Sequence, residues 1–171
     1  MKKAFTLLEV VISITIFMIL ILFLYKVLDQ TKYSNTLLLK KEKELEISNR
    51  LHDILLEDIA ESKSITINMT KEKNSFVKIE TANVYHNPYY KHVTYMISSN
   101  FKLLRIESLE VFNAGENVNM DLFLKNAYID VLANEVELFE VKNSDLNYVF
   151  VIKQKEKERV FYNTYKLGEI Q

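Results

Sequence analysis

The sequence predicts an α+β protein in which one long N-terminal helix packs on an antiparallel β-sheet head. Two patterns support this prediction. Apolar residues fill residues 5–25 almost without interruption, and helical spacing of apolar residues continues to about Ser62. After Ser62 the period changes to two, which is typical of strands with one buried face.

The composition excludes several classes of function. The 22 basic and 23 acidic residues nearly cancel, so the basic surface expected of a nucleic-acid-binding protein is missing. There is no cysteine, so disulfides and thiolate chemistry are excluded. Only two glycines occur, and no glycine-rich phosphate loop is present. We therefore expect neither an enzyme nor a bound cofactor.

Residues 5–25 are long enough to cross a bilayer as a helix, because roughly 21 residues at about 1.5 Å each cover about 31 Å. Lys2 and Lys3 precede this run, and the positive-inside tendency keeps such an end in the cytoplasm. The run is too long for a secretory signal, and no small-residue cleavage pattern follows it. The segment is expected to remain in the mature chain.

Glu9 lies inside the apolar run, where a carboxylate costs roughly 2.5–3.5 kcal/mol on insertion scales. Thr6, Ser13 and Thr15 are also polar, but their hydroxyls can bond back to the helix backbone. A plain membrane anchor explains the length of the apolar run and the lysines before it. It gives no role to Glu9 that would offset the free energy of placing this carboxylate in the membrane. We therefore expect Glu9 to have a functional partner.

The stretch KKAFTLLEVVISITIF closely resembles the class III signal of type IV pilins and of type II secretion pseudopilins. Lys2 and Lys3 supply the basic residues of that signal and Ala4 supplies the small residue. Residues 5–9 supply the Phe-Thr-Leu-Ile-Glu-like start of its hydrophobic helix.

The resemblance implies cleavage between Ala4 and Phe5 by the prepilin peptidase, followed by methylation of the new amino terminus at Phe5. Glu9 would be the fifth residue of the mature chain. In this family that glutamate attracts the terminal amine of a neighbouring subunit during assembly. Ala4 replaces the usual glycine, which predicts slower processing. The helix lacks the proline often found there, which predicts a straighter helix.

The resemblance also divides the chain. Residues 1–4 would be the leader, 5–25 the transmembrane half of the helix, 26–62 its periplasmic amphipathic half, and 63–171 the β head. The protein would be a single-pass inner-membrane protein with a cytoplasmic N-terminus and a periplasmic C-terminal domain, incorporated into a pilus or pseudopilus.

An apolar stripe occupies the end of the predicted helix. Its members recur at helical spacing, and one of them, Asp58, is a carboxylate. The members are Ile47, Leu51, Ile54, Leu55, Asp58 and Ile59. Fewer than three heptads match a coiled coil, so packing on a sheet is favoured over helix pairing.

Seven segments alternate like strands: SITINM, NSFVKIETANVY, HVTYMIS, FKLLRIES, NEVELFEVK, NYVFVIKQ and ERVFYNTYK. Hairpin turns are expected at residues 98–100, 143–145 and 155–157. The segment 113–128 is equally compatible with a loop or a short helix.

Two of these regions have a narrower resemblance. RLHDILLEDIAES and VTYMISSNFKLLRIES resemble the J-type minor pseudopilins of type II secretion. The positions that carry this resemblance are Leu51, Leu55, Asp58, Tyr95, Leu104 and Arg105.

No catalytic or metal-binding motif stands out. His86 and His92 flank NPYYK at a spacing that matches no common zinc signature, and His52 lies far away in sequence, so surface histidines are expected. Residues 114–121 form a weak candidate calcium loop. The tyrosines Tyr85, Tyr89, Tyr90 and Tyr95 fit sheet core and loop packing better than an exposed binding surface.

The favoured function is structural: a minor pilin or pseudopilin that primes or caps a filament for secretion, DNA uptake or pilus extension. Its partners would be the prepilin peptidase, sister major and minor subunits and the inner membrane, with no nucleic acid. A minor role is favoured because neither a disulfide nor a convincing calcium loop stabilises the head. The alternative is an unprocessed bitopic protein whose β-domain binds a ligand or partner.

Overall fold

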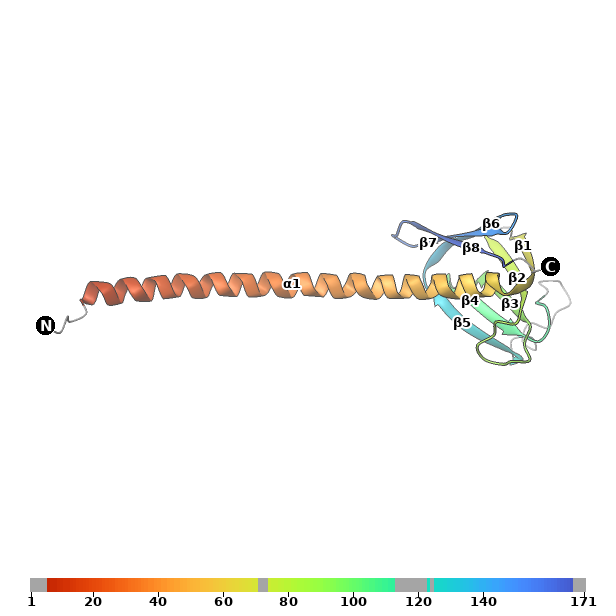
Figure 1. Ribbon diagram of the computed structural model, residues 1–171, viewed down its shortest axis with the longest axis horizontal. Coiled ribbons are helices and arrows are strands. Elements are labelled where there is room, and N and C mark those ends of the chain that lie inside the picture. Colours follow the sequence, from red (N-terminus) through yellow and green to blue (C-terminus); the bar gives the residue numbers. More distant parts are fainter. Residues whose placement is uncertain (1–5, 71–73, 113–122, 124, 168–171) are drawn as a thin grey trace. The chain divides into compact units, whose positions relative to one another are not determined.

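The computed structural model describes residues 6–70, 74–112, 123 and 125–167. Within these residues a long helix, α1 (Leu7–Ala60), precedes eight strands (Figure 1). The chain forms two compact units, Met1–Ser48 and Asn49–Gln171, and the division falls within α1. The predicted long helix is therefore confirmed.

The strands of the described part of the second unit are antiparallel and form two sheets. The five-stranded sheet has the order β1-β2-β3-β4-β5, and the three-stranded sheet has the order β6-β7-β8. Their bounds are β1 Ser62–Met69, β2 Ser75–Thr81, β3 His92–Ile97, β4 Leu103–Ser108, β5 Ala127–Ala133, β6 Val136–Ser144, β7 Asn147–Gln154 and β8 Arg159–Tyr165. Each strand pairs with its sequence neighbour within its sheet, so both sheets are meanders, as short polar connections favour.

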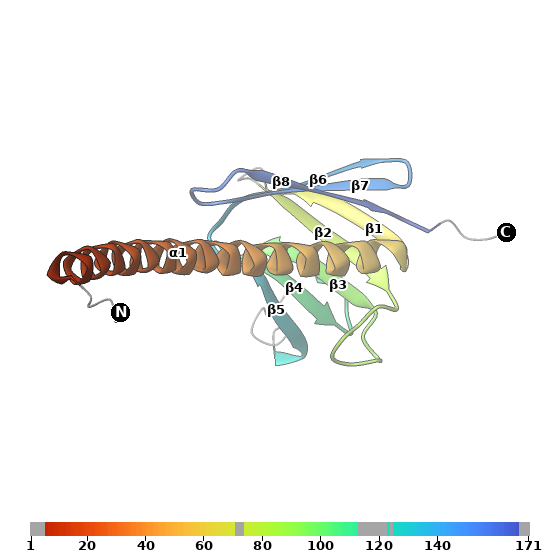
Figure 2. The same cartoon turned by 60° about the vertical axis from the view of Figure 1, so that its left-hand side comes forward.

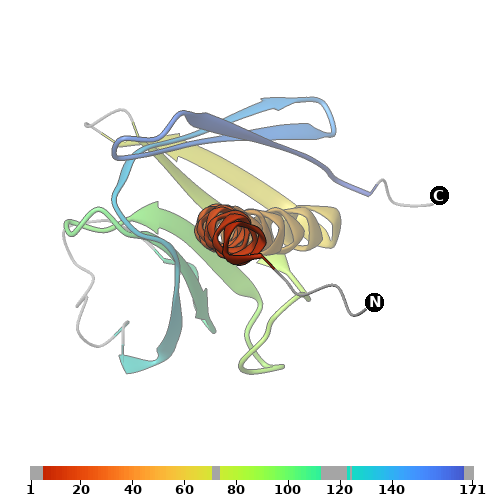
Figure 3. The same ribbon diagram turned by 90° about the vertical axis from the view of Figure 1, so that its left-hand side faces the viewer.

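The last turns of α1 supply one side of the hydrophobic core. They lie between the three-stranded sheet and strands β3–β5 of the larger sheet (Figures 2 and 3). Leu51, Leu55 and Ile59 are buried against core residues of both sheets, among them Tyr95 and Phe139. The apolar stripe thus packs on sheets, as expected, rather than on another helix.

The stripe is shorter than the sequence predicted. Ile47 is 55% exposed and Ile54 is only partly buried, whereas Asp58 is buried. Helical spacing identifies a face of the helix, but it does not show where along the helix the sheets begin to cover that face.

Strand β5 (Ala127–Ala133) was not predicted: residues 113–128 were expected to form a loop or short helix, and residues 129–133 were assigned to no element. Residues 113–122 lie outside the described part of the chain, but β5 begins at Ala127. It is an edge strand of the described sheet and pairs with β4, and all seven of its residues are exposed or half-buried. An edge strand that buries neither face well lacks the regular alternation of apolar and polar residues from which strands are predicted.

One predicted turn is shorter than expected. Asn143 and Ser144 pair with Tyr148 and Asn147 as the end of the β6–β7 ladder. The connection is therefore the pair Asp145-Leu146, and Asp145 has a φ of 53°. Aspartate tolerates this left-handed conformation better than most residues.

Candidate functional site

The start of α1 is a capping box built by Thr6 and Glu9. The Glu9 carboxylate Oε2 accepts hydrogen bonds from the Thr6 backbone N–H at 2.9 Å and from its hydroxyl at 3.1 Å. In return, the Glu9 N–H donates to Thr6 Oγ1 at 3.3 Å. This T-x-x-E pattern satisfies two backbone donors that a helix otherwise leaves unpaired. Glu9 therefore has a partner within its own chain.

Ser13 and Thr15 bond back to the helix backbone as predicted, whereas the Thr6 hydroxyl, expected to do the same, instead bonds forward to Glu9. Ser13 Oγ donates to the Glu9 carbonyl and Thr15 Oγ1 to the Val11 carbonyl, both at 2.8 Å. These bonds to the preceding turn remove the cost of placing hydroxyl groups in an apolar environment.

The first part of α1 has the length and hydropathy of a membrane span. Its most apolar window reaches a mean hydropathy of 2.9, and none of that window is buried in the structure. The predicted leader charges Lys2 and Lys3, and the cleavage-site residues Ala4 and Phe5, lie outside the described residues.

A buried charged network joins the end of α1 to the five-stranded sheet. Arg105 on β4 makes a two-pronged contact with Asp58 of α1, from Nε to Oδ2 at 2.8 Å and from Nη2 to Oδ1 at 2.9 Å. The Tyr95 hydroxyl donates to Asp58 Oδ2, and Asn83 Nδ2 donates to Oδ1 at 2.9 Å. Burial raises the pKa of Asp58, and these hydrogen bonds act in the opposite direction.

Glu107 extends this network on β4. Its Oε1 accepts from Arg105 Nη1 and from the Tyr85 N–H, the latter at 2.7 Å, and its Oε2 accepts from the His86 N–H at 3.0 Å. Burial acts to raise the pKa of Glu107, but the hydrogen bonds from Tyr85, Arg105 and His86 outweigh it, so the net pKa is lowered. The Tyr85 ring packs under the guanidinium, 4.3 Å from Cζ to the ring centroid.

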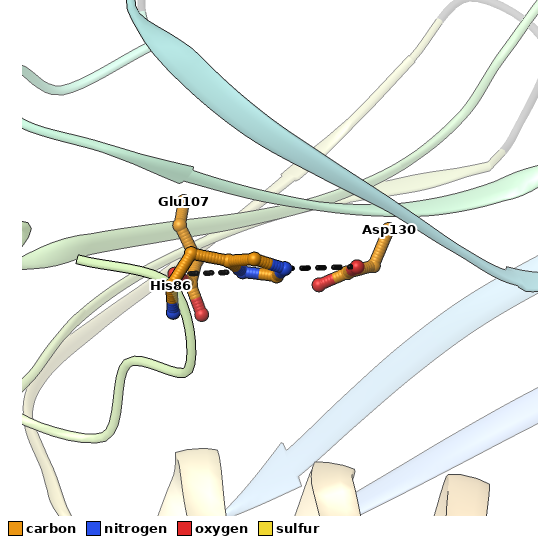
Figure 4. A group of neighbouring side chains, drawn as sticks. All are labelled: His86, Glu107 and Asp130. Atoms are coloured by element: carbon orange, nitrogen blue, oxygen red, sulfur yellow. Dashed lines mark hydrogen bonds and ion pairs between the residues drawn. The ribbon is translucent and has the colours of Figure 1, made fainter.

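His86 lies between two carboxylates, which its sequence position gave no reason to expect (Figure 4). Its Nδ1 is 3.2 Å from Glu107 Oε2, and its Nε2 is 3.5 Å from Asp130 Oδ1 on β5. Glu107 and Asp130 come from neighbouring strands, and His86 comes from the loop between β2 and β3.

The remaining candidates are scattered. His52 Nε2 faces the Asn163 carbonyl at 3.1 Å, and His92 opens β3. Tyr95 is fully buried in the core, whereas Tyr85 and Tyr89 are exposed loop residues and Tyr90 is half-buried. The weak calcium-loop candidate, residues 114–121, lies outside the described part of the chain.

Comparison with known proteins bears on the N-terminal site. Residues 1–25 match the family model of the prokaryotic N-terminal methylation motif. The chain carries a type IV pilin-like signal. No curated protein and no solved structure matches the chain.

This signal indicates a pilin- or pseudopilin-like protein, a group that is structural rather than catalytic. It also implies processing by a prepilin peptidase and assembly with other pilins. The helix of the described structure and its antiparallel sheets agree with a pilin-like α+β architecture.

Sequence reasoning identified Glu9 but missed its capping box, although the T-x-x-E spacing is a local signal that could have revealed it. It singled out Asp58, Tyr95 and Arg105 without pairing them, and it missed Glu107, Asn83 and Asp130. A carboxylate within an apolar helical stripe and an arginine within a strand were the available signals.

Proposed function

We propose that this protein is a minor pilin or pseudopilin, a structural subunit that primes or caps a type IV pilus-like or type II secretion-like filament. The observation that carries the proposal is the methylation motif over residues 1–25, with Glu9 four residues after the expected first residue of the mature chain. In the proposed topology Lys2 and Lys3 are cytoplasmic, α1 is retained as the membrane anchor, and the β head is periplasmic.

The geometry of the capping box fits a role for Glu9 in assembly. Both of its hydrogen bonds from Thr6 end on the same carboxylate oxygen, Oε2. A carboxylate accepts up to about four hydrogen bonds, so Glu9 has capacity for a second partner while it still caps the helix. The proposed partner is the methylated amine of Phe5 in a neighbouring subunit, an opposite charge that the low-dielectric bilayer makes strongly attractive.

The narrower proposal is a J-type minor subunit, and it rests on the sequence resemblance of residues 50–62 and 93–108. Five of the six positions that carry this resemblance are buried: Leu51, Leu55, Asp58, Tyr95 and Arg105. They form the contacts that hold the end of α1 on the sheet. The positions that carry the resemblance are therefore the ones that position the end of α1 on the sheet.

The first test is intact-mass analysis of the protein from membranes with and without the prepilin peptidase. We expect Met1–Ala4 to be lost, and one methyl group gained on Phe5, only when the peptidase is present. Ala4→Gly should be processed at least as fast, while Ala4→Leu should block cleavage without changing the span. A leader retained under both conditions would favour the unprocessed bitopic protein.

A second test separates anchoring from assembly. Glu9→Gln keeps a capping side chain but removes the charge, whereas Thr6→Ala removes the capping hydroxyl and keeps the charge. We expect Glu9→Gln to abolish cross-linking to sister subunits while the protein stays in the membrane. Unchanged cross-linking of Glu9→Gln would remove the basis for the assembly role.

A further inference from the structure

The cluster of His86, Glu107 and Asp130 is assembled from three separate parts of the head. Arg105 on β4 pairs with Asp130 on β5, and Glu107 pairs with Tyr128, so these four side chains share one face of the sheet. The loop between β2 and β3 places His86 over this face, where its ring stacks on Tyr128 at 4.8 Å and an interplanar angle of 9°. The imidazole is therefore held in a defined plane.

Arg105 organises the two carboxylates of the cluster without occupying their outer oxygens. Its Nη1 contacts Glu107 Oε1 and lies 3.9 Å from Asp130 Oδ2. The other oxygens, Glu107 Oε2 and Asp130 Oδ1, face the two ring nitrogens of His86. Each carboxylate thus turns one oxygen to the guanidinium and one to the imidazole.

Negative charge exceeds positive charge in this network. Asp58, Glu107 and Asp130 supply three carboxylates, and Arg105 supplies one guanidinium. Glu107 is fully buried, and its two oxygens accept hydrogen bonds from Arg105 and from the N–H groups of Tyr85 and His86. A further cation beside His86 would balance the charge.

The distances from the two imidazole nitrogens to the carboxylates indicate two different interactions. The 3.2 Å from Nδ1 to Glu107 Oε2 suits a hydrogen bond, which places the proton on Nδ1 and leaves the lone pair on Nε2. The 3.5 Å from Nε2 to Asp130 Oδ1 is long for a hydrogen bond. Two ligands of a tetrahedral zinc ion, each roughly 2.1 Å from the metal, lie about 3.4 Å apart.

We propose that His86 Nε2 and Asp130 bind a divalent metal ion of the zinc class, with Glu107 holding the imidazole in the required tautomer and orientation. The three residues each offer a ligand atom, all within 4.8 Å of one another. A carboxylate that accepts from the other nitrogen of a metal-binding histidine is a recurrent arrangement in zinc sites. His86 and Asp130 are about one-third exposed, so solvent reaches the remaining ligand positions. An imidazole nitrogen disfavours Ca²⁺ and Mg²⁺, which prefer oxygen ligands.

The test uses the tag-free full-length chain in detergent micelles, stripped with a chelator and then titrated with Zn²⁺ or Co²⁺. We expect Zn²⁺ to raise the melting temperature and Co²⁺ to give visible absorption bands with nitrogen and oxygen ligation. His86→Gln and Asp130→Asn should each weaken binding at least about 10-fold, by loss of a direct ligand. His52→Gln and His92→Gln are the matched controls and should bind as the parent does.

Zn²⁺ binding that survives His86→Gln would overturn the assignment, as would an equal stabilisation by Ca²⁺. Absence of both the Co²⁺ bands and the Zn²⁺-induced stabilisation would also overturn it. His86→Gln alters a partly exposed loop residue, so it keeps the test decisive if Asp130→Asn folds poorly. The inference does not depend on filament assembly, because binding is measured on the isolated chain.

Discussion

The two ends of α1 both carry apolar side chains but have opposite surroundings. Near its start, residues such as Leu20 and Phe17 are more than half exposed, and the one acidic side chain in this part of the run, Glu9, is hydrogen-bonded to Thr6, three residues earlier. Near its end, Leu55 and Ile59 are fully buried, and Asp58 is bonded to residues of the sheet and its loop. The first stretch needs an external apolar environment, while the second is stabilised within its own chain. Truncating side chains at each end of α1 and comparing the effects on stability tests this difference in surroundings.

The largest effect is expected for Arg105→Leu. It leaves Asp58 and Glu107 buried without their cation, which should destabilise the head by about 3–5 kcal/mol. Urea unfolding of the full chain in micelles measures the change. Lys153→Leu is the control: it breaks the exposed pair of Lys153 with Glu137 at 2.6 Å and should cost at most about 1 kcal/mol. Equal costs for the two variants would contradict the importance assigned to burial.

Leu55→Ala and Leu20→Ala compare the same substitution at the two ends of the helix. Leu55 is fully buried, so its truncation leaves a cavity and should lower the unfolding free energy by roughly 2–5 kcal/mol. Leu20 is 54% exposed, and its truncation should leave the unfolding midpoint of the head in micelles unchanged. A similar loss from both would show that the two stretches are not stabilised differently.

Alkaline pH should weaken the network at the end of the helix. Burial raises the pKa of Tyr95 well above 10, and it raises that of Tyr85 to about 12. Because the folded state holds these phenols neutral, their contribution is complete below pH 10 and is lost as pH rises from 10 to about 12 and beyond. Unfolding measured from pH 8 to 12 should show this decline.

Tyr95→Phe is the control for that titration. It should cost about 1–3 kcal/mol at pH 8, because Asp58 loses a donor. It should also make the alkaline decline shallower. A decline as steep as that of the parent would mean that Tyr95 is not one of the groups responsible.

The smallest effect is expected for Thr6→Ala, which removes the hydroxyl of the capping box. Loss of a cap costs about 0.5–2 kcal/mol of local helix stability. Amide hydrogen exchange should become faster in the first turn of α1 and remain unchanged around Leu55. Thr6→Ser keeps the hydroxyl and should exchange like the parent. Faster exchange around Leu55 would contradict a local effect.

The sequence by itself determined the features that depend on neighbours along the chain. The apolar run, the position of Glu9, the long helix and seven of the strands follow from spacing and composition within short windows. The family match lies in one of these windows, residues 1–25, and agrees with the motif residues named there. Local patterns also predicted the backward hydroxyl bonds of Ser13 and Thr15.

Only the tertiary structure decided which side chains meet across the sheets. Asp58 and Arg105 are 47 residues apart, and His86 reaches Glu107 and Asp130 only because β4 and β5 pair beneath its loop. The pairing of β4 with β5 and the path of the loop between β2 and β3 join residues far apart in the sequence, so patterns within short windows do not show which side chains meet. Edge strand β5 was missed for a related reason: its place is set by pairing with β4 rather than by burial of its own side chains.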